Sequence, residues 1–467
     1  MSLFKAREWW SSRLDREEEF GSGGIAIGNL DNSPHGESKI VTGSFSGMLR
    51  VFHPRQAEFN AEDLVHEEEL SGGPILQIEI GQFQPSTLGS GARGVSLAVL
   101  HPRSLSVYNF QGHGDGGAVS YYKLDRMYEH KLERSAYNMT FGRFGNAKGT
   151  RDMIAVQSMD GQLAFFEQDA LSFTRFLPNF LLPSPICYVP DMDSFIICNS
   201  QMDCECYGYK ALLDATSSQS GRPGGQDAPN SPSSGGLSSS KKVEPHWKVN
   251  LGEHINEISV GRYTAGLVGD KKDIILLGER SIFCLQETGS IRLQRRLDFY
   301  PACSLTYPCP GGATVDHGDG LACGDHNLVV ATHDSVMNIY RGKVLIWAQK
   351  MNCVPLRIFT GQFGGIPGFI VTLEDNGTVD ITYVGTDPPA SSAVAMDSSK
   401  DLNYEEMDEE HRRLLSIIRE TTTDGKMEPT DRLLLEVAVP DVLDAFPEDN
   451  GQEMAHVARE QRCVTVP

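Results

Sequence analysis

The sequence predicts an all-β fold, a seven-bladed β-propeller over residues 1–385, followed by a short helix and a truncated β appendage. Three observations support this prediction. The chain of 467 residues contains 47 glycines and 24 prolines, which are many for a helical protein. A strand–turn–strand pattern recurs up to residue 385. Beyond it the pattern changes to helical periodicity and then to one strand-like segment with little chain after it.

The clearest copy of the repeat lies at residues 141–166. The segment Phe141–Gly145 (FGRFG) comes first, and residues 151–158 then read as a strand. Asp160 and Gly161 follow as a tight turn, because this dipeptide tolerates the positive φ angles that a two-residue hairpin requires. Residues 162–166 read as a second strand that ends in two phenylalanines.

The same order of strand, turn and second strand occurs seven times. The copies are Lys39–Phe52, Ile80–Tyr108, Phe141–Phe166, Ser194–Tyr207, Val260–Leu285, Asn327–Tyr340 and Thr360–Tyr383. Because a single four-stranded sheet cannot bury both of its faces, seven such units are expected to pack radially and bury each face against a neighbour. A β-sandwich is the alternative, but a sandwich does not require a repeat period.

The spacing of the copies suits four-stranded blades. Their last residues lie 41 to 78 residues apart, against the ~40–50 residues of a typical propeller blade. The longest interval contains residues 215–242, a Ser/Gly/Pro-rich insert that is almost without apolar residues and is therefore predicted to be disordered. Without these 28 residues the interval is 50 residues, an ordinary blade.

Outer strands and ring closure complete the predicted propeller. Candidate outer strands with partial alternation of polar and apolar residues are Tyr121–Leu132, His246–Leu251, Ile291–Leu297 and Val344–Gln349. Closure of a propeller normally requires the N- and C-terminal strands to share a blade, which protects the sheet edges.

After the propeller, residues 386–401 read as a linker and residues 402–420 as an amphipathic helix. Met407, Leu414, Leu415 and Ile418 form one apolar stripe, and acidic residues precede basic ones, as suits the helix dipole. A helix of this length is marginal alone, so the stripe is expected to dock. Docking on its own propeller, docking on a partner helix and a frayed, unsupported helix remain open; we single out the four residues as a candidate partner interface. Residues 421–467 contain the strand-like segment Leu433–Val439 and a tail, an incomplete appendage.

Composition and motifs exclude several functions. The formal net charge of −21 argues against nucleic-acid binding, which rests on clustered Lys and Arg. The N-terminus has no apolar segment of signal-peptide length, which indicates a non-secreted protein. A metal site drawn from Cys303, Cys309, His317, Cys323 and His326 has irregular spacing, and Cys204 and Cys206 supply only two ligands, so no metal and no cofactor is expected. No catalytic motif stands out.

Several segments of the sequence, in order from residue 1 to about residue 420, match one known family. They are residues 1–10 (MSLFKAREWW), 39–52 (KIVTGSFSGMLRVF), 97–101, 128–132, 138–161, 175–178, 277–280, 383–388 (YVGTDP) and 402–406. These segments resemble the family of the ninth Bardet-Biedl syndrome protein, the parathyroid hormone-responsive family.

The resemblance implies a non-enzymatic scaffold subunit of the BBSome, a coat-like assembly for ciliary membrane-protein trafficking. Its partners would be the propeller-platform and TPR subunits of that complex, with membrane and ciliary cargo reached only indirectly. It would be found in the cytoplasm, in the cilium and at the ciliary membrane, and at centriolar satellites or the basal body. The sequence departs from the family pattern after about Glu420, where most of the appendage is missing. The alternative function is a propeller enzyme or small-ligand binder that uses the central channel.

Overall fold

Residues 6–12, 18–33, 36–83, 94–113, 121–146, 151–178, 183–220, 243–264, 272–308, 326–384 and 404–423 are described by the structure, a computed structural model. The chain divides into two compact units, Met1–Pro388 and Pro389–Pro467. The predicted linker, residues 221–242 of the predicted insert and the segment Leu433–Val439 lie outside the described residues.

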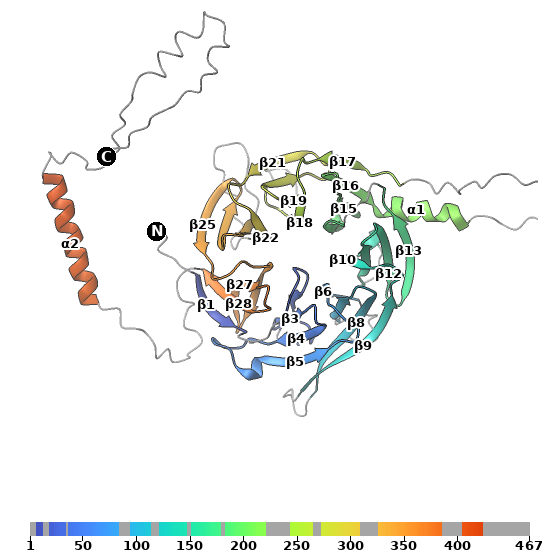
Figure 1. Cartoon of the computed structure of the whole chain (residues 1–467), viewed down its shortest axis with the longest axis horizontal. Helices are drawn as coiled ribbons and strands as arrows, with labels where there is room; N and C mark the ends of the chain where they lie inside the picture. The colour runs from blue at the N-terminus through green and yellow to red at the C-terminus, as the bar shows by residue number, and fades with distance from the viewer. Residues whose placement is uncertain are drawn as a thin grey trace, which may run out of the picture. The chain divides into compact units, whose positions relative to one another are not determined.

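The first unit is a seven-bladed β-propeller, as predicted (Figure 1). Every blade is a four-stranded antiparallel sheet, and successive first strands contact one another around the central channel. In order from the first strand to the fourth, the first blade is β2 (Ile25–Gly28), β3 (Lys39–Gly43), β4 (Met48–Phe52) and β5 (Leu64–Glu69). The second is β6 (Gln77–Gly81), β7 (Ser96–Leu100), β8 (Ser104–His113) and β9 (Tyr121–Lys131). The third is β10 (Ala136–Gly142), β11 (Met153–Ser158), β12 (Gln162–Glu167) and β13 (Ala170–Phe176).

The remaining blades follow the same plan. The fourth is β14 (Ile186–Val189), β15 (Ser194–Cys198), β16 (Asp203–Gly208) and β17 (Trp247–Asn250). The fifth is β18 (Ile255–Gly261), β19 (Asp273–Gly278), β20 (Ser281–Leu285) and β21 (Ile291–Arg296). The sixth is β22 (Pro301–Pro308), β23 (His326–Thr332), β24 (Val336–Arg341) and β25 (Val344–Lys350). Three short 3-10 helices, Ala61–Asp63, Phe144–Asn146 and Pro190–Met192, lie in connections.

The seventh blade closes the ring. It contains β26 (Arg357–Phe363), β27 (Ile366–Leu373) and β28 (Val379–Val384), and its fourth strand is β1 (Ala6–Ser11), from the N-terminus. Ser12 N donates to Val379 O at 3.0 Å, and Val379 N donates to Ser12 Oγ at 2.8 Å. The two ends of the propeller sequence therefore share one sheet, as closure requires.

The hydrophobic core consists of seven clusters, one between each pair of neighbouring blades. Alternation along the buried second strands produces this division. In β19, Ile274 and Leu276 pack toward the fourth blade, whereas Ile275 and Leu277 pack toward the sixth. Because successive side chains point to opposite faces, one continuously apolar strand supplies two interfaces.

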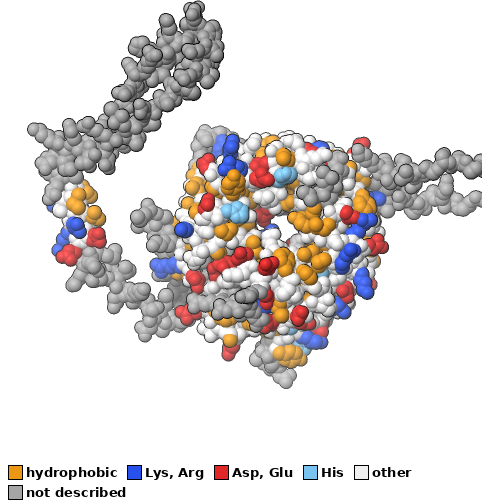
Figure 2. Space-filling model, in the orientation of Figure 1, with side chains coloured by type: hydrophobic (Ala, Val, Ile, Leu, Met, Phe, Trp, Pro, Cys, Tyr) orange, Lys and Arg blue, Asp and Glu red, His pale blue; other side chains and the backbone are white. Residues whose placement is uncertain are grey.

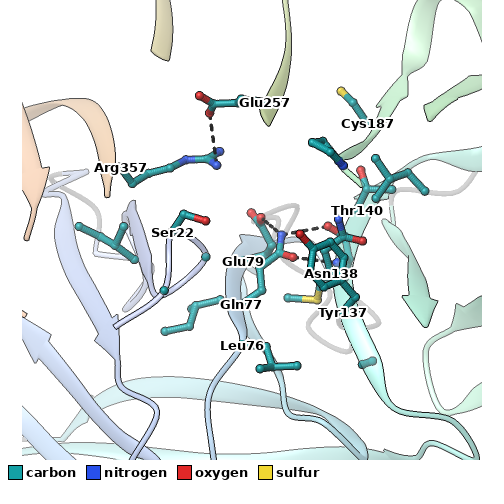
Figure 3. A pocket seen from close by; sticks show the side chains of 18 of the residues that line it. Ser22, Leu76, Gln77, Glu79, Tyr137, Asn138, Thr140, Cys187, Glu257 and Arg357 are labelled. Atoms are coloured by element: carbon teal, nitrogen blue, oxygen red, sulfur yellow. Dashed lines mark hydrogen bonds and ion pairs between the residues drawn. The ribbon is translucent and has the colours of Figure 1, made fainter. Parts of the chain in front are cut away.

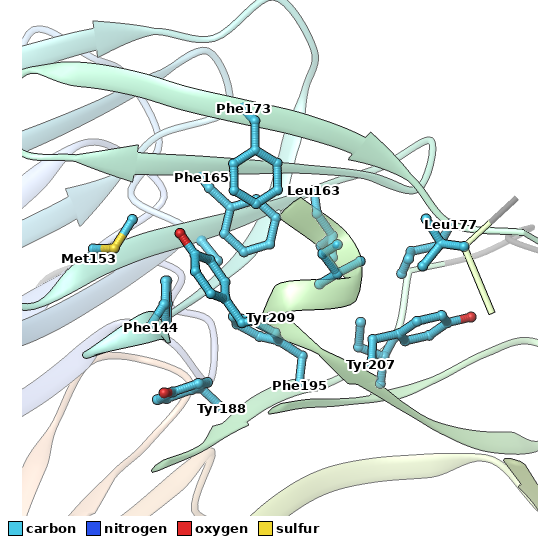
Figure 4. Close-up of a cluster of buried hydrophobic side chains, with 14 residues drawn as sticks. Phe144, Met153, Leu163, Phe165, Phe173, Leu177, Tyr188, Phe195, Tyr207 and Tyr209 are labelled. Atoms are coloured by element: carbon cyan, nitrogen blue, oxygen red, sulfur yellow. The ribbon is translucent and has the colours of Figure 1, made fainter. Parts of the chain in front are cut away.

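The cluster between the third and fourth blades is rich in aromatic rings (Figure 4). Phe165 stacks on Phe173 with ring centroids 4.3 Å apart, and Phe144 meets Tyr188 edge to face at 4.6 Å. Helix α1 (Tyr209–Ser220), which directly follows β16, adds Tyr209 and the fully buried Leu212. This helix was not predicted from the sequence, and it extends past Ala215 into the segment predicted to be disordered.

The second unit contributes helix α2 (Tyr404–Thr423). The predicted helix spans residues 402–420, so the two ranges overlap over most of their length. Among the described residues, no helix is both long enough and apolar enough to cross a membrane.

Candidate interaction sites

The apolar stripe of α2 is solvent-exposed within its own unit. Leu414, Leu415 and Ile418 have exposed fractions between 40% and 58%, and Ile417, which the sequence analysis did not select, lies in the same range. Met407 lies in the first part of the helix, where side chains are outside the described set. On the polar face, Arg412 and Asp408 form an ion pair of 2.6 Å one turn apart. The helix therefore presents a charged face and an aliphatic face.

A second exposed apolar surface lies on the propeller. The fourth strand of the sixth blade, β25, exposes Val344, Leu345 and Ile346 in succession. A β-bulge places Ile346 between the pairs Tyr340–Leu345 and Ile339–Trp347, so the usual alternation is interrupted there. This strand was predicted from the sequence, but its apolar surface was not, although the run Val-Leu-Ile-Trp in an outer strand could have indicated it.

The centre of the propeller holds a cavity of about 490 Å³. The cavity is lined by residues from the first strands of six blades and by turn residues. The strand residues lie near the N-terminal ends of these strands. On the face shown in Figure 2, hydrophobic side chains gather near the centre and acidic side chains lie beside them. The charged residues in the cavity wall are Glu79, Glu257 and Arg357 (Figure 3).

Glu257 is fully engaged by its neighbours. Arg357 Nη1 lies 3.3 Å from Glu257 Oε1. The other oxygen, Oε2, accepts from Ser304 N at 2.7 Å and from Ser304 Oγ at 3.0 Å. The charge of Glu257 raises the pKa of Arg357, so this guanidinium stays charged. The pair links the fifth, sixth and seventh blades.

Glu79 lies opposite this pair, beside a fixed amide. Gln77 Nε2 donates to Glu79 Oε1 at 2.7 Å and to Met139 O at 2.9 Å, while Gln77 Oε1 accepts from Met139 N at 2.7 Å. The Gln77 amide thereby joins the second and third blades. The Glu79 side chain keeps partial access to the cavity, but protein surrounds it, and burial raises its pKa above the usual value. The hydrogen bond from Gln77 and the charge of Arg357 act in the opposite direction.

The raised pKa of Glu79 predicts a pH-dependent stability difference. A carboxyl group whose pKa is higher in the folded state binds its proton more tightly when the protein is folded. Its ionisation therefore destabilises the fold as the pH rises above its unfolded-state pKa of about 4.5. We expect Glu79→Gln to raise the melting temperature at pH 8 and to leave it nearly unchanged at pH 4. Paired thermal denaturation of both proteins at the two pH values measures this, since the other titrating groups are common to both. A melting-temperature difference of the same size at both values would contradict it.

The cysteines that could suggest metal or redox chemistry are mostly interior thiols. Cys204 and Cys206 are buried with Cys198 in the cluster between the fourth and fifth blades. In the pair of strands β22 and β23, Cys303 lies opposite Ala331, and His326 lies opposite Pro308. Cys303 and His326 are therefore at opposite ends of the pair, ~17 Å apart along the strands at 3.3–3.4 Å per residue. They are therefore not brought together, and Cys309, His317 and Cys323 lie outside the described residues.

One group of possible metal ligands was not foreseen. Ligand atoms of Cys353, Glu374 and Asp380 lie within 4.8 Å of one another. Burial, followed by a hydrogen bond with Glu374, raises the pKa of the Cys353 thiol. The thiol is thus held in its protonated form in the metal-free protein.

Comparison with known proteins gives consistent results. The family model described as PTHB1 N-terminal matches residues 1–388. Protein PTHB1 of Xenopus laevis is 38% identical over 454 residues, which cover 95% of this chain and 50% of that protein. Protein PTHB1 of Homo sapiens is 38% identical over 425 residues, which cover 90% of this chain and 44% of that protein. The chain spans about half the length of the curated relatives it matches.

Among solved structures, the fold is similar to that of BBS1N in its crystal structure with ARL6DN. The TM-score is 0.55 at 11% sequence identity, and the match covers 82% of this chain and 98% of the other. At this identity the similarity concerns the fold alone.

Proposed function

Since the chain belongs to the PTHB1 family, we propose that it is a protein-docking scaffold of the BBSome that works in ciliary membrane-protein trafficking and performs no catalysis. The partners would be the propeller-platform and TPR subunits of that complex. Contact with the membrane and with ciliary cargo would be indirect, through the complex. The expected locations are the cytoplasm, the cilium with its membrane, and centriolar satellites or the basal body.

The exposed aliphatic stripe of α2 is the observation that carries this proposal. Leu414 and Ile418 are four residues apart, and Met407 precedes Leu414 by seven, which is the spacing of a helix–helix seam. A 20-residue helix with an exposed stripe gains most of its stability by packing on another element. We therefore place a partner helix on this stripe. The similar propeller BBS1N is itself found in a complex with another protein, ARL6DN, which supports a docking role for the fold.

Charge reversal on the stripe tests the proposal. Leu414→Glu combined with Leu415→Glu is expected to reduce recovery of the chain with co-expressed BBSome subunits at least tenfold. Burial of each leucine contributes about 1.5–3 kcal/mol, and a buried unpaired glutamate adds a penalty. Quantitative co-purification measures the effect. Ser416→Glu is the matched control, because Ser416 lies on the opposite side of the same helix and the change adds one charge of the same sign.

Circular dichroism should give equal helix content for the double variant and the control. Unchanged recovery of the double variant with the other subunits would refute the docking role of this stripe.

The alternative of a channel enzyme receives no support from the described residues of the cavity. Burial raises the pKa of Cys187 to about 12, so this thiol is protonated at neutral pH and is not an activated nucleophile. Both oxygens of Glu257 already have partners.

A further inference from the structure

The central cavity contains one carboxyl group, Glu79, that has no direct ion-pair partner among the described residues. Two acidic groups and one basic group carry the charge of its described wall, and Arg357 is paired with Glu257. Among the described residues, Glu79 forms no ion pair, and its side chain accepts one hydrogen bond, from Gln77 Nε2. A buried carboxylate is stabilised when a cation lies beside it. The described wall therefore has one acidic group more than it has basic groups, and a second cation beside Glu79 would balance it.

A fixed amide donor and an amide acceptor without a partner lie near this carboxylate. Gln77 is held by both of its amide atoms on the backbone of Met139. Asn138 Nδ2 donates to Ser184 O at 3.2 Å, which directs its Oδ1 elsewhere, and that oxygen is buried without a partner. Figure 3 shows Glu79, Gln77 and Asn138 close together. A guanidinium or ammonium group can donate to a carboxylate and an amide oxygen at once.

The mouth of the cavity carries exposed apolar side chains. Phe45, Tyr137 and Met159 line the cavity and are 40% to 50% exposed. Phe45 and Met159 lie in the turns after β3 and β11, next to the starts of the first strands. Tyr137 is the extra residue of a β-bulge in β10, between Ala136 and Asn138, and a bulge re-aims a side chain that would otherwise follow the pleat. The mouth therefore offers apolar contact around a negatively charged interior.

We propose that this cavity binds a basic side chain, arginine or lysine, from an extended segment of a partner protein. The cationic head enters and lies against Glu79 and Asn138, and apolar neighbours in the segment pack on Phe45, Tyr137 and Met159. A free small cation needs only the interior, whereas the apolar mouth suits the flanking residues of a polypeptide. This goes beyond the scaffold role of α2 and does not depend on it.

Titration with capped peptides tests the proposal. The probes are acetyl-Phe-Arg-Phe-amide, the same peptide with neutral citrulline in place of arginine, and agmatine as a free cation, each titrated calorimetrically into the purified chain. We expect the arginine peptide to bind at least tenfold more tightly than the citrulline peptide. Glu79→Gln should remove this preference, and Glu69→Gln, an exposed change on β5, should retain it. Tyr137→Ala should lower the affinity for the arginine peptide at least fivefold and leave the affinity for agmatine unchanged.

Other results would overturn the proposal. These are equal affinity for both peptides, an unchanged preference in Glu79→Gln, no binding of the arginine peptide at millimolar concentration, or agmatine binding as tightly as the peptide. Melting curves of each variant establish that it is folded. The variant with Leu414→Glu and Leu415→Glu should bind the arginine peptide normally, which separates this inference from the docking role of α2.

Discussion

Replacement of Trp10 by alanine is expected to lower the free energy of unfolding of the propeller by about 3–5 kcal/mol. Trp10 is fully buried in β1, the strand that closes the ring. Its ring meets Phe52 and Phe59 edge to face at 5.7 Å and 5.6 Å, and its Nε1 donates to Asp63 Oδ2 at 2.9 Å. Truncation would leave a cavity between the seventh and first blades and remove one partner of a buried carboxylate. Urea denaturation followed by far-UV circular dichroism measures the loss.

Two further variants separate the causes. Trp10→Phe keeps most of the volume but removes the donor to Asp63, so a loss of about 1–3 kcal/mol is expected. Trp9→Ala changes the neighbouring residue, whose side chain is only partly buried against Phe369, and should cost less than Trp10→Ala. Equal losses for Trp9→Ala and Trp10→Ala would contradict the closure argument.

Replacement of Asp273 by alanine is expected to lower the free energy of unfolding by about 3–5 kcal/mol, because it removes one partner of a buried ion pair and leaves the other charge uncompensated. Asp273 is fully buried at the start of β19. Its Oδ2 accepts from Thr264 N at 2.6 Å and from Thr264 Oγ1 at 2.9 Å, and its Oδ1 accepts from Arg292 Nη1 at 2.8 Å. One carboxylate thus holds β21 and the connection after β18 against β19. Thermal and urea denaturation measure the effect.

A double variant shows how much of this loss is the unpaired charge. Asp273→Ala combined with Arg292→Met removes both charges, so it should be less destabilising than the sum of the two single changes. Additive losses would mean that the two side chains do not act as a pair. A loss below 1 kcal/mol for Asp273→Ala alone would contradict the expectation.

The fold was predictable because the most regular strands of the chain are also the most buried. The last residues of the seven repeat copies, from Phe52 to Tyr383, all lie in the third strand of a blade. The hairpin between second and third strands recurs with turn glycines such as Gly161 and Gly377 at positive φ. The fourth strands were harder to predict, because one face of them is solvent-exposed and their alternation is weak. Helix α1 was missed because its large apolar residues, Tyr209, Leu212 and Leu213, all lie in its first half, and the sequence from Thr216 onward is polar and Ser-rich.

The cavity could not be predicted from the sequence in the same way. Glu79, Glu257 and Arg357 belong to the second, fifth and seventh blades, and no local pattern marks any of them. They come together only when the ring closes. The stripe of α2 lies within one helix, so its periodicity alone selects Leu414, Leu415 and Ile418, and the partner of that stripe stays a prediction.

Ring closure by β1 has a consequence for the order of events during synthesis. The hydrogen bond between Val379 and Ser12 joins residues 367 positions apart, so β1 joins its sheet only after the other strands of the seventh blade have been made. At 5–20 residues per second, synthesis of the intervening chain takes roughly 20–70 s. During that interval the apolar face of β1, with Trp10, has no sheet to join. The nascent chain therefore leaves β1 unpaired until the seventh blade has been made, and chaperone demand is expected to fall sharply once residue 384 has emerged.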